Sequence, residues 1–140
     1  MVGYQKESGK NKTEKQMASN TSRTLEYLRN KGWEAGIVER FNSFAGRRGV
    51  RQDLFGVIDI VALGDNKIIG VQSCGISSFS EHDKKILDNP LALRWLRSGG
   101  RLLLIGWGKV KLKRGSKAMR WQPRIKEYKI KDFKGVKQSL

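Results

Sequence analysis

Two apolar runs in the middle of the chain, Val57–Leu63 and Ile68–Cys74, flank the polar segment Gly64–Lys67. Short β-rich runs on either side of a Gly/Asp/Asn turn predict a β-hairpin. A two-residue turn at the centre of that segment sets the register, and counting outward from it places Asp59 directly opposite Gln72. Residues that pair in an antiparallel ladder share a face, so we expect this carboxylate and this amide to meet.

Before this hairpin, the pattern predicts one helix, one strand and one loop. Apolar residues at helical spacing indicate a helix that begins at Thr13 or Thr21 and ends at Gly32, since glycine commonly follows the last turn of a helix. The alternating segment Trp33–Phe41 predicts the first strand. The segment Asn42–Gln52 contains two glycines and three arginines, which predicts a flexible, cationic loop.

After the hairpin, the pattern predicts two helices. The spacing Ser78-x-x-Glu81 is typical of a capping box and predicts a helix that ends at Leu87. Asn89 is expected to cap a second helix, with Pro90 in its first turn and a glycine pair at its end. The residues expected on the buried face of this second helix are Leu91, Trp95 and Leu96.

The C-terminal third of the chain predicts strands. Arg101–Trp107 is apolar almost throughout, as in a buried strand, whereas Lys109–Lys113 alternates and predicts a half-exposed strand with one cationic face. A turn at Arg114–Ser116 leads to a returning strand, Trp121–Ile130, and Pro123 places that strand at the edge of a sheet. We therefore expect an appended basic β-hairpin.

The charge of the chain indicates a polyanionic partner. It has 29 basic and 13 acidic residues, for a net charge of +16. Such a charge draws a protein to polyanions, so nucleic acid, and DNA above all, is the expected partner; an anionic membrane is the weaker alternative. No apolar run approaches the roughly 20 residues of a membrane span, and Met1–Asn20 lacks the apolar core of a signal peptide. We expect no membrane association and an intracellular, cytoplasmic location.

The length of 140 residues predicts one folded domain. Residues 1–12 are polar and basic without periodicity and are expected to form a flexible arm, followed by the domain at 13–133 and a frayed C-terminus at 134–140. The single cysteine, Cys74, excludes an internal disulfide. With His82 as the single histidine, a structural zinc site of the usual four-ligand kind is excluded as well.

A carboxylate in the middle of an apolar hairpin needs a partner, because burying an ionised group alone is costly. Asp59 has two interpretations: it forms a hydrogen bond with Gln72 that fixes the strand register, or it belongs to a site for a hard divalent cation. Two further acids, Glu39 and Asp53, fall beside the same loop. Carboxylate and carbonyl oxygens are the ligands that such cations prefer.

The predicted order is helix, three strands, helix and strand, followed by the basic hairpin. Together with GVIDIVAL and IIGVQSC around the central turn, this order resembles the αβββαβ core of the PD-(D/E)XK superfamily, the restriction-endonuclease-like and Holliday-junction-resolvase-like nucleases. The resemblance covers about residues 21–107. It implies an α/β fold with a mixed central sheet flanked by helices. It also implies a metal-dependent DNA endonuclease that hydrolyses phosphodiester bonds with Mg²⁺ or Mn²⁺, selective for branched DNA and with little sequence readout.

Members of this superfamily place an Asp on the second strand and an acidic residue followed by x-Lys on the third. By this resemblance Asp59 is the motif aspartate, Gln72 stands where the acidic residue is expected, and Cys74 stands where the lysine is expected. Gln72 is neutral, so it would ligate an ion only through its amide oxygen and more weakly than a carboxylate. Cys74 cannot supply the positive charge of a lysine.

The resemblance assigns roles to several further residues. The expected metal ligands are Asp59, Gln72, the backbone carbonyl of Ser73, and Glu39 or Asp53, with Glu26 on the first helix as an alternative acid. The charge of the missing motif lysine would come from Lys84 or Lys85 on the following helix, or from Arg51. The residues expected to contact phosphates are Arg47, Arg48, Arg51, Lys84, Lys109, Lys111, Lys113 and Arg114.

Two other functions are consistent with the sequence. The first is a non-catalytic DNA- or RNA-binding module on the same fold, which the departures at Gln72 and Cys74 favour. The second is a small RNA-binding protein of unrelated fold, in which the pairing of Asp59 with Gln72 would be an accident. Nucleases of this type often act as dimers, and a homodimer is therefore expected by resemblance, although no apolar stripe in the chain identifies an interface.

Overall fold

The computed structural model describes residues 19–134, in which three α-helices, two short 3-10 helices and seven strands alternate. In chain order these elements are α1 (Asn20–Asn30), β1 (Glu34–Ile37), β2 (Arg40–Asn42), β3 (Val50–Gln52), β4 (Ile60–Gly64), β5 (Lys67–Gly75), η2 (Ile76–Ser78), α2 (Phe79–Leu87), α3 (Pro90–Arg97), β6 (Arg101–Lys111), β7 (Met119–Glu127) and η3 (Ile130–Asp132). The expected N-terminal arm at residues 1–12, and all but the first residue of the expected C-terminal tail, lie outside the described residues. Within residues 19–134, no helix has the length and apolar character needed to cross a membrane.

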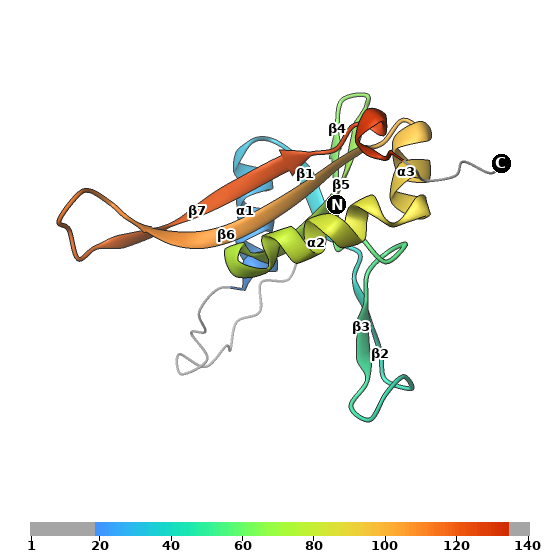
Figure 1. The fold of residues 1–140 in the computed structure, drawn as a ribbon, viewed down its shortest axis with the longest axis horizontal. Helices are drawn as coiled ribbons and strands as arrows, with labels where there is room; N and C mark the ends of the chain where they lie inside the picture. Colours follow the sequence, from blue (N-terminus) through green and yellow to red (C-terminus); the bar gives the residue numbers. More distant parts are fainter. Residues whose placement is uncertain (1–18, 135–140) are drawn as a thin grey trace, which may run out of the picture.

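A mixed five-stranded sheet in the order β1-β4-β5-β6-β7 forms the centre of the fold (Figure 1). The strands β1, β4 and β5 are antiparallel neighbours, and β5 then runs parallel to β6 after a crossover through α2 and α3. β7 returns antiparallel to β6 and forms one edge of the sheet, as Pro123 predicts. The mixed α/β class and the central sheet flanked by helices are therefore confirmed.

The predicted register of the central hairpin is correct. Gly64 pairs with Lys67, and the ladder continues to the pair formed by Ile60 and Val71. The backbone N–H of Asp59 also donates to the carbonyl of Val71, at 3.0 Å, just beyond the last ladder pair. A shift of one residue would move one strand's side chains to the opposite face from their present partners, so pairs that share one core, such as Ile60 with Val71 and Ala62 with Ile69, specify the register.

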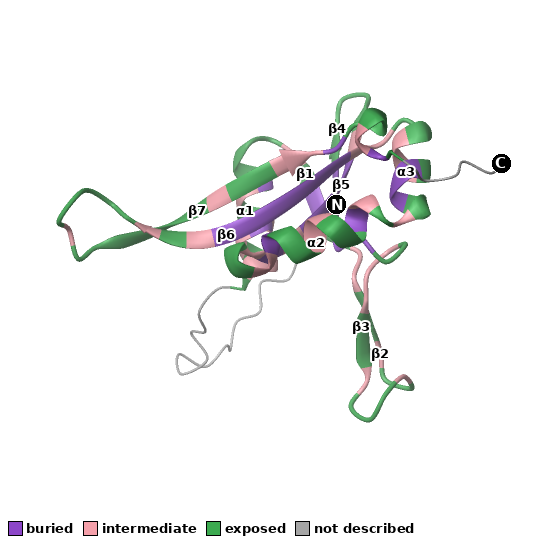
Figure 2. Ribbon diagram, in the orientation of Figure 1, coloured by how far each residue is buried: buried purple, intermediate pink, exposed green. Residues whose placement is uncertain are grey.

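The two faces of the sheet carry separate apolar cores. On the α1 side, Ile60 and Ile69 pack with Leu28 of the helix; on the α2 and α3 side, Ile58 packs with Leu93. Figure 2 shows the buried positions concentrated along β5 and β6, between these helices. Because side chains alternate along a strand, Asp59 and Gln72 belong to the face that α2 and α3 cover.

The segment predicted as one strand and one loop is instead divided between two sheets. β1 ends at Ile37, and the chain then leaves the central sheet at Arg40 to form the β2–β3 hairpin with Val50–Gln52. Figure 1 shows this hairpin projecting away from the body of the domain. Most of its side chains are exposed, so its sequence lacks the apolar alternation by which strands are recognised.

The helix boundaries differ from the predictions at their N-terminal ends. α1 begins at Asn20 rather than at Thr21, because Ser19 caps it by accepting a hydrogen bond from the backbone N–H of Ser22 at 3.1 Å. The predicted capping box of α2 is wrong: the Ser78 hydroxyl donates to the carbonyl of Gly75, within the preceding 3-10 turn. The other candidate start of α1, at Thr13, lies outside the described residues.

The N-terminal cap of α3 is confirmed, but its buried face is displaced from the prediction. The Asn89 side-chain oxygen accepts from the backbone N–H of Leu91 at 2.8 Å. Leu91 itself is 47% exposed, whereas Ala92 and Leu93 are buried. Trp95 and Leu96 are partly buried against the same core, as predicted, so the buried face of the helix is shifted toward Ala92 and Leu93 and leaves Leu91 at its exposed margin.

Thr24 joins α1 to two strands through its hydroxyl. This residue is fully buried, and its Oγ1 accepts hydrogen bonds from the Ser73 hydroxyl at 2.6 Å and from Trp107 Nε1 at 2.9 Å. The backbone N–H of the same Ser73 faces Asp59. The packing of α1 therefore influences the position of β5 at the point where the acidic side chains gather.

Replacement of Thr24 by valine is expected to lower the free energy of unfolding by about 1–3 kcal/mol, because the buried N–H of Trp107 loses its acceptor. Urea denaturation followed by circular dichroism measures the change. Thr21→Val, one turn earlier on the same helix, is the control, since it alters the same chemical group without removing this acceptor. An equal loss in both variants would show that the hydrogen bonds of Thr24 are not the cause.

Candidate functional site

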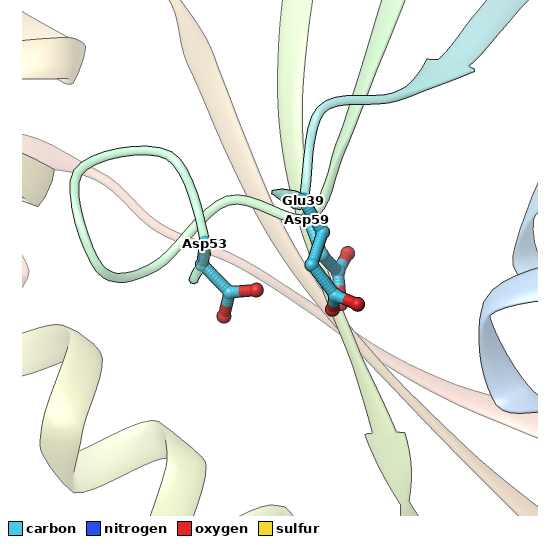
Figure 3. Close-up of side chains that lie close together, drawn as sticks. All are labelled: Glu39, Asp53 and Asp59. Carbon is cyan, nitrogen blue, oxygen red and sulfur yellow. The ribbon is translucent and has the colours of Figure 1, made fainter. Parts of the chain in front are cut away.

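Three carboxylates converge where the β2–β3 hairpin leaves the central sheet. Glu39 precedes β2, Asp53 follows β3, and Asp59 precedes β4, so separate turns of the chain deliver one acid each (Figure 3). One oxygen from each of the three lies within 4.8 Å of the others. Hard divalent cations bind oxygen ligands at about 2.0–2.6 Å, so this spacing allows one ion to contact all three. We call these residues the acidic cluster.

Backbone hydrogen bonds bring Glu39 to Asp59. The carbonyl of Asp59 accepts from the backbone N–H groups of both Val38 and Glu39, at 2.9 and 3.3 Å. Two successive residues just beyond the end of β1 therefore face a single residue just before β4, as in a β-bulge, and such an arrangement bends the chain and redirects its side chains. This local bend carries the Glu39 carboxylate toward Asp59.

A tight loop brings Asp53 to the same place. Leu54 and Ile58 form an isolated β-bridge, with N···O distances of 2.7 and 3.0 Å. Between them, Phe55 and Gly56 both have positive φ, at 56° and 78°. Two consecutive residues of positive φ make a narrow reversal of the type I′ kind, and glycine adopts the second position without strain. The reversal places Asp53 next to Asp59.

The predicted contact between Asp59 and Gln72 is confirmed. Gln72 Nε2 donates to Asp59 Oδ2 and to Asp53 Oδ2, both at 3.2 Å, and the backbone N–H of Ser73 donates to Asp59 Oδ2 at 3.1 Å. The amide therefore bridges two acids through its nitrogen. Ligation of an ion by the Gln72 oxygen requires the amide to rotate by half a turn.

The Ser73 carbonyl lies on the same edge of the strand as its N–H, because the two groups of one strand residue point to the same side. The N–H of Ser73 points to Asp59. The carbonyl is thus directed toward the end of β4, beside the acidic cluster, as the expected ligand role requires.

Asp59 is buried with only part of its hydrogen-bonding capacity satisfied. The residue is 3% exposed, and its Oδ1 has no hydrogen-bond partner among residues 19–134. Burial raises the pKa of Asp59 to about 7, and the charges of Asp53 and Glu39 act in the same direction, against the lowering by the Ser73 N–H and Gln72. A buried acceptor of this kind fits a cation as its missing partner.

Burial also raises the pKa of Asp53, and the nearby Glu39 adds to that effect. The Gln72 hydrogen bond and the charge of Lys85 oppose it. The cluster is thus a group of like charges that repel one another in a partly desolvated position. Such perturbed acids are common at functional sites, although structural networks also produce them.

Basic side chains border the acidic cluster. Arg51 forms an ion pair with Glu39 at 2.9 Å, while most of its own side chain stays exposed. A cleft of about 680 Å³ lies beside the cluster, and its lining includes Asp53, Arg40, Arg51 and Lys85. A phosphate in this cleft would meet three cationic side chains and stand next to the acids.

The structure distinguishes among the candidates for the missing motif lysine. Cys74 is buried, and burial raises the pKa of its thiol, so it stays neutral. Lys85 lines the cleft and its charge lowers the pKa of Asp53. Lys84 is exposed on α2 and is not among the residues that line the cleft. Of the three candidates, Lys85 and Arg51 therefore lie beside the acids, and Lys84 does not line the cleft.

Glu26, the alternative acid, lies elsewhere. It is exposed on α1 and lines a separate cleft with Trp107 and Trp121, on the face opposite to Asp59. The Arg23 guanidinium stacks over Trp121 in that region, 3.4 Å from the ring centroid. Glu39 and Asp53 are therefore the acids that accompany Asp59.

The residues expected to contact phosphates are divided between two projecting hairpins and α2. Those on or beside the β2–β3 hairpin are Arg47, Arg48 and Arg51; those on the β6–β7 hairpin are Lys109, Lys111, Lys113 and Arg114; Lys84 is on α2. Sequence reasoning missed Arg40 and Thr24. The position of Arg40 directly after Glu39 could have indicated it, whereas no sequence signal identifies Thr24, whose role depends on tertiary contacts.

Replacement of Asp59 by asparagine is expected to abolish a pH dependence of stability. The pKa of Asp59 is higher in the folded state, near 7, than its ordinary 3.8. The folded state therefore binds more protons between pH 4 and 7, and the free energy of unfolding falls as pH rises across that window, by at most about 4 kcal/mol. Above pH 7 the asparagine variant should be the more stable protein.

Urea unfolding with a chelator present, at pH 5 and pH 8, tests this expectation. Asp65→Asn, in the exposed turn between β4 and β5, provides the matched control. A wild-type pH profile that the Asp59→Asn variant reproduces would contradict the assignment of the raised pKa to Asp59.

The arrangement joins oxygen ligands for a divalent cation to a cleft lined with cations. It can hold a hard metal ion through Glu39, Asp53 and Asp59 and receive a phosphate beside it. Comparison with known proteins gave no match: no family model, no curated protein and no solved structure matches the chain.

Proposed function

We propose that this protein is a Mg²⁺- or Mn²⁺-dependent DNA endonuclease that hydrolyses phosphodiester bonds. The observation that carries the proposal is the acidic cluster, in which Asp59 keeps a buried oxygen without a hydrogen-bond partner among the described residues. A carboxylate trio of this kind is unexpected in a chain with a net charge of +16 unless it serves a ligand. A bound divalent cation would serve both the acids and a DNA phosphate.

The topology supports a restriction-endonuclease-like core. One helix precedes an antiparallel trio of strands, and a helical crossover then leads to a parallel fourth strand, as in the αβββαβ order. Asp59 lies at the start of the second strand of that trio, and Gln72 lies opposite it on the third. The β2–β3 hairpin is an insertion into this order, and the β6–β7 hairpin extends it.

The chain supplies a ligand set in this proposal. Asp59, Asp53 and Glu39 would hold the ion, together with the Ser73 carbonyl and, after rotation of its amide, the oxygen of Gln72. When bound, the ion supplies positive charge to the scissile phosphate and lowers the pKa of a coordinated water.

The cationic side chains neutralise and orient the DNA. Lys85 and Arg51 line the cleft beside the acids and would offset the charge of the phosphate that enters it. The lysines of β6 extend the phosphate track along the second hairpin. Contacts of this kind position a duplex without reading its bases, so binding depends steeply on salt and weakly on sequence.

A non-catalytic DNA- or RNA-binding module is the second candidate, and one contact favours it. Gln72 donates to both Asp53 and Asp59, so the acids are held together by an amide without any ion. If the cluster serves only to hold these segments of the chain together, the two hydrogen bonds of Gln72 are sufficient and no ion is required. The two candidates make different predictions for metal binding and for cutting.

The wild-type protein is expected to nick supercoiled or branched DNA only with Mg²⁺ or Mn²⁺, and Asp59→Asn should lose at least about a hundredfold of this activity, because a direct ligand is removed. Gel assays with supercoiled, four-way-junction and single-stranded DNA measure cutting, and chelator should abolish it. Asp65→Asn is the control. Equal DNA binding with no cutting by either protein would favour the non-catalytic module.

Metal binding is tested separately from cutting by the thermal unfolding midpoint. Mn²⁺ should raise the midpoint of the wild-type protein, because a ligand that binds only the folded state stabilises it. Gln72→Glu should lower the Mn²⁺ concentration needed for this effect by about tenfold, since it adds a charged ligand. Gln122→Glu on the exposed strand β7 adds the same charge elsewhere and should leave the concentration unchanged; equal shifts in both variants would contradict a local role of Gln72.

A further inference from the structure

The β2–β3 hairpin combines an exposed aromatic tip with a concentration of positive charge, of which Arg51 alone forms an ion pair with a described acid, Glu39. Phe44 is 97% exposed at its turn, the highest exposure among the large apolar residues described. Residues 40–52 include four arginines and no acidic residue. An isolated apolar side chain on a surface needs no explanation, but a fully exposed phenylalanine at the end of a projecting, purely basic hairpin does.

The tip is a defined turn that presents this side chain outward. The Asn42 side-chain oxygen accepts from the backbone N–H of Phe44 at 3.0 Å, which fixes the start of the turn. Just before β3, Gly49 has a φ of +83°, and a Cβ there would come within 2.2 Å of the Phe41 ring. Phe41 therefore packs across the hairpin itself, whereas Phe44 makes no such contact and is directed away.

We propose that Phe44 is a wedge that inserts between unstacked bases of branched or otherwise unpaired DNA, with Arg47 and Arg48 on the neighbouring phosphates. Apolar side chains inserted at base steps are a general means of kinking or holding opened DNA, and base stacking on aromatic rings is favourable and tolerant of sequence. Arginines next to the wedge supply phosphate contacts where it enters. This inference rests on the proposed function for its DNA partner and specifies the substrate class.

The position of the hairpin relates the wedge to the acids. The hairpin leaves the body directly after Glu39 and returns directly before Asp53, so both of its strands are anchored in the acidic cluster. Phe44 follows Glu39 by five residues, which span at most about 17 Å in an extended strand. Nucleotides are spaced about 3.4 Å apart along one strand of DNA, so the wedge would open the stack within about five nucleotides of the acids.

Charge favours DNA over a second copy of this chain as the partner of the exposed Phe44 tip. A second copy of the chain carries the same basic hairpin and a net charge of +16, so two copies repel one another. DNA offers both phosphates for the arginines and π-faces for the ring. Self-association through Phe44 is therefore an outcome that the test must detect.

The experiment measures 2-aminopurine fluorescence at the branch point of a four-way junction, with chelator present so that no cutting occurs. Wild-type protein should increase the fluorescence as the base unstacks. Phe44→Ala should remove this increase and weaken junction binding about tenfold, while binding to an unbranched duplex changes less than twofold. Because Phe44 is almost fully exposed, the variant should keep the wild-type unfolding midpoint.

Two control variants separate the wedge from general effects. Leu63→Ala removes another half-exposed apolar residue, near the end of β4, whereas Asp59 precedes the start of that strand, and it should change neither signal. The double variant Arg47→Ala, Arg48→Ala should weaken binding to junction and duplex alike and reduce the salt slope by about two.

The outcomes are distinguishable from those of the cutting assay. Unchanged fluorescence and junction affinity in Phe44→Ala would overturn the wedge, whether or not the protein cuts DNA. If the wild-type protein shows the Phe44-dependent increase in fluorescence but never cuts DNA with metal, the wedge is retained and the nuclease proposal is wrong. A dimer in sedimentation that Phe44→Ala converts to a monomer, together with the loss of binding, would assign the tip to self-association instead.

Discussion

The incompletely satisfied carboxylate of Asp59 is the constraint on which the site depends. One oxygen accepts from the Ser73 N–H and from Gln72, while the other is buried without a partner among the described residues. Desolvation raises the pKa of Asp59, and the negative charges of Asp53 and Glu39, on adjacent turns, raise it further. The fold tolerates this arrangement because β5 presents two donors at the level where β4 begins, which holds the acids in place at a cost in stability.

In the proposed function, the geometry that creates the cluster would also determine where DNA approaches. The chain leaves the central sheet at Glu39 and returns at Asp53, so the same departure that gathers the acids also projects a basic hairpin from them. α2 contributes Lys85 from the other side of the cleft. A polyanion drawn by the overall charge would thus meet cations around the acidic cluster. The acidic cluster is therefore distinguished by where the fold places its three carboxylates, and not by the number of acids in the sequence.

The sequence predicted the central hairpin and its register because a short polar turn between two apolar runs fixes which residues of the two strands pair. It also identified all three acids, but not the means by which they meet. The approach of Asp53 depends on two consecutive positive φ values at Phe55 and Gly56, and that of Glu39 depends on a bulge opposite Asp59. Both are backbone features without a hydrophobic pattern. The β2–β3 hairpin escaped prediction for the same reason, since its pairing residues are mostly exposed.

Gln72 explains how one chain can hold acids together and still be suited to a metal. With an acidic residue at this position, a fourth carboxylate would face Asp53 and Asp59, and the folded state would depend on a cation to offset the repulsion. The amide instead donates to both, so the domain keeps this site assembled without an ion. The same hydrogen bonds must break before the Gln72 oxygen can ligate, so they compete with the metal. In the proposed function, weaker metal affinity and a fold that does not depend on metal would both follow from an amide at this position in place of a carboxylate.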